Sequence, residues 1–153
     1  MLTGMDTLIT ILHVGTAVFI VGPMAIIPMT GLRALRAGNA AQVRTLASST
    51  MLFTWLSLLT FVFGFGAMSM APARYHLTFT TPWILWSAIL YIVAFVLNAF
   101  VVVPQMRKAA DAMTATPEGS APAKPAGYGV IAATNGIASL LLVVVVILMI
   151  WKP

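Results

Sequence analysis

One histidine stands inside an uncharged, apolar stretch. His13 lies in the run LITILHVGTAVFIVGPMAIIPMTGL, residues 8–32, and no charged residue occurs between Asp6 and Arg33. An imidazole surrounded by hydrocarbon is a candidate functional group, because polar side chains are costly there. Such a histidine can ligate haem, bind a metal ion or relay a proton. The alternative is a histidine that hydrogen-bonds to a neighbouring helix.

A second histidine and two methionines are expected at the same end of the molecule as His13. Met68 and Met70 end the second apolar run, and His76 follows in the next connection. Two histidines suffice for bis-imidazole haem ligation, and imidazole with thioether sulfur suits Cu(I). We therefore name His13 and His76 as candidate haem ligands. The alternative is a copper site formed by His13, Met68, Met70 and His76.

The sequence offers few residues for thiol chemistry, acid–base catalysis or phosphate binding. The sequence has no cysteine, and its apolar runs contain no Asp, Glu, Lys or Arg. It shows no carboxylate pair and no glycine-rich loop of the kind that binds phosphate. FGFG at residues 63–66 is too short for such a loop and predicts a notch for helix packing. We expect a protein that is not an enzyme.

The composition predicts a membrane protein. The chain has 153 residues, of which 61% are hydrophobic and 7% are charged, whereas soluble domains are about 25% charged. Crossing a bilayer takes about 20 apolar residues in a helix. Four runs reach that length, at residues 8–32, 46–70, 83–103 and 129–151. We predict an all-α fold: a single-domain integral membrane four-helix bundle surrounded by the lipid bilayer.

The basic residues predict an orientation. Six of them fall in the first and third connections, namely Arg33, Arg36, Arg44, Arg107, Lys108 and Lys124, against Arg74 and Lys152 elsewhere. Positive charge favours the cytoplasmic side. We therefore expect both termini outside the cytoplasm, in the inner (plasma) membrane of a bacterium. These charges are assigned to topology and lipid headgroups, so nucleic acid is not an expected partner. Residues 114–127, rich in Pro, Ala and Gly, predict a flexible cytoplasmic linker.

Two sets of residues predict how the helices pack. Asn98 and Asn135 are expected at similar depth, where they can hydrogen-bond to each other or to their own helices. Ala132 and Gly136 form a pair of small residues four apart, which lets another helix approach closely. That second pair makes a homo-oligomer or a larger membrane complex an expected assembly. Three hydroxyl residues share one face of the second run: Thr50, Thr54 and Ser57.

Two segments of the chain resemble a known family. LHVGTAVFIVGPM at 12–24 and PWILWSAILYIVAFVLNAFVVVPQMRK at 82–108 resemble the bacterial predicted integral membrane proteins of domain-of-unknown-function family 2269. The first helix is more distantly similar to copper-resistance protein D-type membrane domains and to the J-type protoporphyrinogen oxidase. Those relatives also place a histidine early in a helix before a glycine, here His13 and Gly22. The resemblance implies a four-helix membrane protein and, through the distant relatives, haem at His13.

These observations lead to one expected function and two alternatives. We expect a scaffold or accessory subunit of a membrane complex, because the apolar runs and the small-residue pair suit helix contacts better than catalysis. The first alternative is a haem-binding redox or haem-handling protein that uses His13. The second alternative is a small permease for copper or another solute.

Overall fold

A computed structural model of the chain describes residues 4–71, 76–115 and 127–152. The elements are α1 (Gly4–Thr16), η1 (Ala17–Val21), α2 (Gly22–Arg36), α3 (Ala40–Ser69), α4 (Pro82–Leu97), η3 (Asn98–Val102), α5 (Val103–Ala115) and α6 (Tyr128–Trp151). The two η elements are single π-helical turns. No strand occurs in the described ranges. The predicted all-α fold is confirmed.

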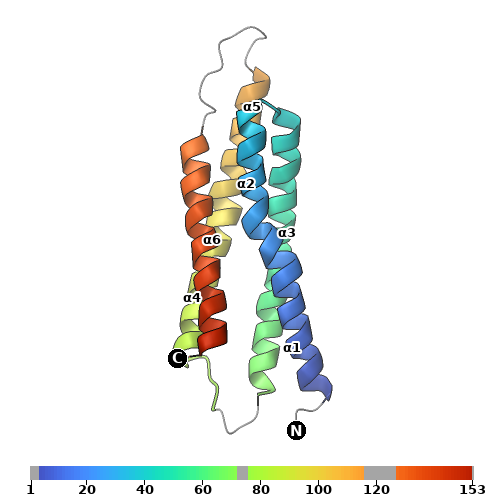
Figure 1. Ribbon diagram of the computed structural model, residues 1–153, viewed down its shortest axis with the longest axis vertical. Coiled ribbons are helices and arrows are strands. Elements are labelled where there is room, and N and C mark those ends of the chain that lie inside the picture. Colours follow the sequence, from blue (N-terminus) through green and yellow to red (C-terminus); the bar gives the residue numbers. More distant parts are fainter. Residues whose placement is uncertain (1–3, 72–75, 116–126, 153) are drawn as a thin grey trace.

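The elements join into four long rods that stand side by side (Figure 1). Gly4–Arg36, Ala40–Ser69, Pro82–Ala115 and Tyr128–Trp151 are each long and apolar enough to cross a membrane. Each expected run overlaps one of these rods, and the rods continue past the runs at their basic ends. The start of α1 and the end of α6 lie at the same end of the bundle (Figure 1). Most of the predicted linker 114–127, from residue 116 to residue 126, lies outside the described residues.

Two of the rods contain a π-helical turn that ends two residues before a proline. In η1 the Gly22 N–H donates to the Ala17 carbonyl, and Pro23 follows. In η3 the Val103 N–H donates to the Asn98 carbonyl, and Pro104 follows. The wider turn relieves the pressure of the proline ring on the preceding turn. The local sequences are FIVGP and FVVVP, so the same device occurs once in each half of the chain.

The two halves also match in their buried faces. Pro104 follows Pro23 at the same interval as Asn135 follows Thr54. At that interval, three buried residues of α3 correspond to three of α6: Thr50, Thr54 and Ser57 to Ile131, Asn135 and Ala138. The bundle therefore consists of two similar helix pairs. The position equivalent to His13 is Ala94, so the imidazole belongs to the first pair alone.

The interior contains two apolar clusters. The connection-end cluster, near the link from α2 to α3, consists of Ala34, Leu35, Val43, Ala47, Val102, Val103, Met106, Ala109, Ala110 and Ile131. The central cluster consists of Met24, Tyr91, Ala94, Ala138 and Leu142. Burial of these side chains on all four rods fixes how the helices face one another.

Polar contacts tie the helices together at the connection end. Arg44 on α3 forms an ion pair with Asp111 on α5, with 2.6 Å between Nη2 and Oδ1. The guanidinium of Arg36 lies 4.8 Å from the centre of the Tyr128 ring, which links α2 to α6. The link between α2 and α3 is short. Asn39 in this link caps α3, because its Oδ1 accepts from the Gln42 N–H at 2.9 Å.

Candidate functional site

The imidazole of His13 is held against α3. Its Nδ1–H donates to the carbonyl oxygen of Thr60 at 2.9 Å, and the side chain is half-buried. Because a carbonyl can only accept, this bond places a proton on Nδ1. In the neutral ring the lone pair then lies on Nε2. Nε2 has no hydrogen-bond partner among the residues that the structure describes.

Two glycines of α3 make room for this contact. A Cβ built on Gly64 would stand 2.9 Å from His13 Cε1, and one built on Gly66 would stand 3.2 Å from Ile9 Cγ2. The FGFG sequence is therefore the notch into which two residues of α1, one turn apart, fit. Sequence analysis predicted a notch there, but not that His13 occupies it.

Thr60 provides a second polar atom near the imidazole. Its Oγ1 is buried and has no hydrogen-bond partner among the described residues. Hydroxyls in membrane helices usually bond back to their own helix, as Thr50 does to Leu46 and Thr54 does to Thr50. The role of Thr60 could not be predicted from the residue types, because its backbone carbonyl makes the contact.

The other candidate haem and copper ligands lie near the end of α3 and in the connection that follows it. His76 is exposed in the connection before α4 and has a positive φ of 44°. Met68 is half-buried near the end of α3, and Met70 follows that helix with 38% of its surface exposed. No hydrogen bond joins His13 to His76 in the described ranges, and no group of three or more His, Asp or Glu gathers there. The structure brings His13 together with Thr60 and Gly64.

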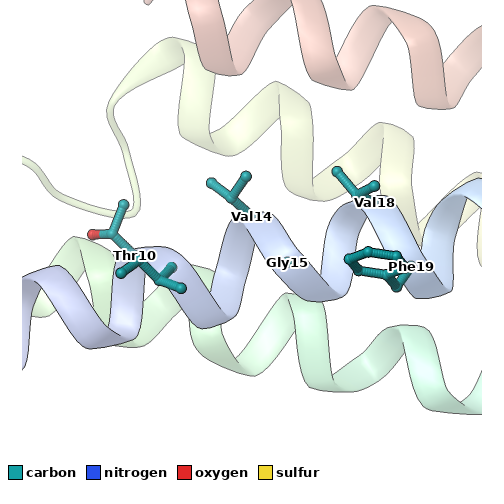
Figure 2. A pocket seen from close by; sticks show the side chains of 6 residues that line it. Thr10, Val14, Gly15, Val18 and Phe19 are labelled. Atoms are coloured by element: carbon teal, nitrogen blue, oxygen red, sulfur yellow. The ribbon is translucent and has the colours of Figure 1, made fainter.

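A shallow apolar hollow lies on the opposite face of α1 from His13. Figure 2 shows Val14 and Val18 projecting from α1 on the side away from α3. Its lining residues are Thr10, Ile11, Val14, Gly15, Val18 and Phe19. Gly15 leaves the gap, and Phe19 beside it is 76% exposed. His13 is not among the residues that line this hollow.

A longer apolar groove of about 420 Å³ runs between α2 and α6. One wall is formed by Val21, Gly22, Ala25, Ile26 and Met29, and the other by Ser139, Leu142, Val143, Val146 and Ile147. The helices are joined along it where Ser139 Oγ donates to the Ala25 carbonyl at 3.3 Å. The groove is therefore a seam between two packed helices that is open on its outer side.

The predicted packing residues occupy different environments. Asn98 and Asn135 are 0% and 1% exposed. Asn98 Nδ2 donates to the Ala94 carbonyl of its own rod at 3.1 Å, and no bond between the two asparagines occurs in the described ranges. Ala132 is half-buried, whereas Gly136 is exposed, with no atom within 4 Å of a Cβ built on it. Gly136 therefore makes no close helix contact within one copy.

A buried tyrosine forms a cross-helix bond that sequence analysis missed. Tyr91 on α4 has its hydroxyl 2.7 Å from Ser57 Oγ on α3. Ser57 also donates to the Thr54 carbonyl at 2.6 Å, so the Tyr91 O–H donates to Ser57 Oγ. The Tyr91 ring stacks on Phe61 with 5.1 Å between centroids. A tyrosine in an apolar run near a serine-bearing run was the available signal.

The sequence of the chain matches a known family. The family of predicted integral membrane proteins named DUF2269 matches residues 7–153. The chain belongs to this family. Membership in DUF2269 places the apolar rods in a lipid bilayer. No curated protein and no solved structure matches the chain.

Proposed function

We propose that this DUF2269 protein is a multi-pass membrane protein that binds haem through Nε2 of His13. The observation that carries this proposal is the 2.9 Å bond from His13 Nδ1–H to the Thr60 carbonyl. Metal-ligating histidines almost always donate their other ring N–H to a carbonyl or carboxylate, which fixes the tautomer and raises the basicity of the ligating nitrogen. Of the three functions considered from the sequence, this contact favours haem binding.

A single oriented histidine suits haem better than a bare metal ion. A porphyrin already supplies four nitrogens to its iron, so the protein adds only one or two axial ligands. His13 supplies one such ligand. The absence of a side chain on Gly64 leaves space for the imidazole of His13. His76, at the same end of the bundle, remains the candidate for a second ligand. When bound, haem supplies one-electron redox chemistry, and Thr60 tunes its ligand.

Titration with haemin tests this proposal. The detergent-purified protein should give a Soret band that saturates near one equivalent, and His13→Ala should abolish the shift. Gly15→Ala is the matched control, because no described atom lies within 4 Å of a Cβ built at that position. Retention of the same spectrum by His13→Ala would overturn the assignment. A circular-dichroism spectrum confirms that each variant stays helical.

The second candidate function is that of an accessory subunit in a membrane complex. It is favoured by the exposure of the first rod: α1 has no buried residue, and α3 is the main helix that it packs against among the described residues. A helix of a partner would cover the hollow at Gly15. Gly15→Leu fills that hollow without touching His13, and it should release a co-purifying subunit. Unchanged migration of Gly15→Leu on a native gel would count against this candidate.

We also propose that this single four-helix domain lies in the bacterial inner membrane with both termini outside the cytoplasm. Of the described basic residues, Arg33, Arg36, Arg44, Arg107 and Lys108 lie at the connection end and Lys152 at the other. Because the chain has no cysteine, single cysteines report topology directly. A membrane-impermeant maleimide should label Phe79→Cys in intact cells and spare Gly38→Cys. The reverse pattern would invert the orientation.

A further inference from the structure

Two buried amide oxygens in the centre of the bundle have no hydrogen-bond partner. Asn98 Oδ1 on η3 and Asn135 Oδ1 on α6 are both unpaired among the described residues. The two elements pack against each other. Buried polar atoms in proteins are nearly always paired, with protein or with ordered water. We therefore expect a hydrogen-bond donor between these two oxygens, because both are unpaired and lie on elements that pack together.

Both asparagines lie between the same two apolar clusters. Along the third rod, Ala94 belongs to the central cluster and Val102 to the connection-end cluster, with Asn98 midway between them. Along α6, Ala138 belongs to the central cluster and Ile131 to the connection-end cluster, with Asn135 between them. The two amides therefore form a polar layer at one depth, closed on both sides by packed side chains.

The hydrogen-bond donors of the Asn98 side chain point away from this layer. Asn98 Nδ2 donates to the Ala94 carbonyl, which turns Oδ1 away from its own backbone. Two buried hydroxyls of α3 also donate to their own helix, Thr50 to the Leu46 carbonyl and Thr54 to the Thr50 carbonyl.

A buried proline adds a further acceptor. Pro28, fully buried on α2, has no N–H to offer the Met24 carbonyl. Met24 belongs to the central cluster, while Ala34 and Leu35 belong to the connection-end cluster. Pro28 therefore lies between the two clusters, as the asparagines do. The layer therefore contains two unpaired amide oxygens, and Asn135 Nδ2 is a side-chain donor in it.

The chemistry of the layer selects a small, neutral hydrogen-bond donor. The four apolar runs contain no Asp or Glu, so a cation here would be an uncompensated charge inside hydrocarbon, which is costly. Water donates two hydrogens and is held stably by two to four polar partners. We propose that the polar layer is an occluded water-binding site, in which water bridges Asn98 Oδ1 and Asn135 Oδ1.

A double-mutant cycle tests the bridge. If water joins the two amides, Asn98→Leu or Asn135→Leu strips it of a partner and exposes the remaining oxygen. Each single variant should then lower the midpoint unfolding temperature by about 2–4 °C, and the double variant should lose less than the sum. If the oxygens are dry and independent, each leucine raises the midpoint and the effects add, which would overturn the proposal. Phe100→Leu, at a 65% exposed position in η3, is the control for tolerance of the turn.

Solid-state NMR of the wild-type protein in bilayers gives a readout that does not depend on mutant folding. The chain has three asparagines, Asn39, Asn98 and Asn135. Asn39 lies outside the apolar runs and serves as the hydrated reference. Magnetisation transferred from water should reach all three side-chain amides. Transfer to Asn39 alone would overturn the proposal. Because neither measurement involves haem, the outcome is independent of the role of His13.

Discussion

The imidazole of His13 rests on the bare backbone of Gly64. A methyl group on that glycine would stand 2.9 Å from Cε1, while Nδ1–H donates across 2.9 Å to Thr60. The glycine sets how closely the ring approaches α3, and the carbonyl sets which nitrogen faces it. One helix turn of α3 thus determines the pose of the imidazole in the membrane.

Gly64→Ala should displace the ring. The added methyl pushes His13 away from α3, and the bond to Thr60 lengthens or breaks. We expect a loss of about 1 kcal/mol in unfolding free energy, the scale of polar contacts in membrane bundles, together with weaker haemin binding. Gly15→Ala is the matched control, because nothing lies within 4 Å of a Cβ there. Equal effects of the two variants in a thermal melt and in the haemin titration would contradict the contact.

The Ser57–Tyr91 bond should appear as a coupling energy. Tyr91→Phe keeps the ring on Phe61 and removes only the O–H that donates to Ser57. Ser57→Ala removes the acceptor. The cycle formed with the double variant should give a coupling of about 0.6–1.7 kcal/mol, measured by unfolding in detergent. Strict additivity would show that the two hydroxyls do not interact.

The start of α3 should depend on its cap. Asn39→Ala leaves the Gln42 N–H without its acceptor at 2.9 Å, which costs about 1 kcal/mol. Asn39→Asp keeps an acceptor and should retain wild-type stability. A melt in which the aspartate variant is as unstable as the alanine variant would assign the effect to something other than the cap.

The Arg44–Asp111 pair should contribute little despite its short distance. The side chains are 54% and 65% exposed, and such pairs are worth about 0–1 kcal/mol. Arg44→Gln should therefore change the unfolding midpoint only slightly, and the difference should shrink as salt rises because screening weakens exposed pairs. A large, salt-independent loss would show that the pair acts with other charges.

The fold was readable from composition because lipid imposes a single rule on every residue of a span. Uncharged runs of sufficient length must be helices, and that rule located all four rods. The contacts of His13 depend on how α1 packs against α3, which residue types alone do not predict. His13 was identifiable as the titratable residue in its run, but its partner is the backbone carbonyl of Thr60, which any residue would have supplied. The sequence therefore singles out His13 but not the carbonyl group that orients it.

The asparagines show the same limit to prediction from the sequence. Their shared depth was predictable from distance to the helix ends, and both are buried. Which group each one bonds was not predictable, because Asn98 lies in a π-helical turn and its side chain reaches the Ala94 carbonyl. Tyr91 was missed for a related reason: its partner Ser57 lies on a rod that aligns with it only when the bundle is assembled.

The π-helical turn η1 separates two parts of the first rod that face different neighbours, His13 toward α3 before it and Met24 in the core after it. An i→i+5 turn holds one residue more than an α-helical turn, which is equivalent to rotating one part against the other by about 100°. Gain or loss of a single residue here would rotate the segment that carries His13, while the segment after the turn kept its packing. A one-residue change in this turn would therefore give the imidazole a different orientation.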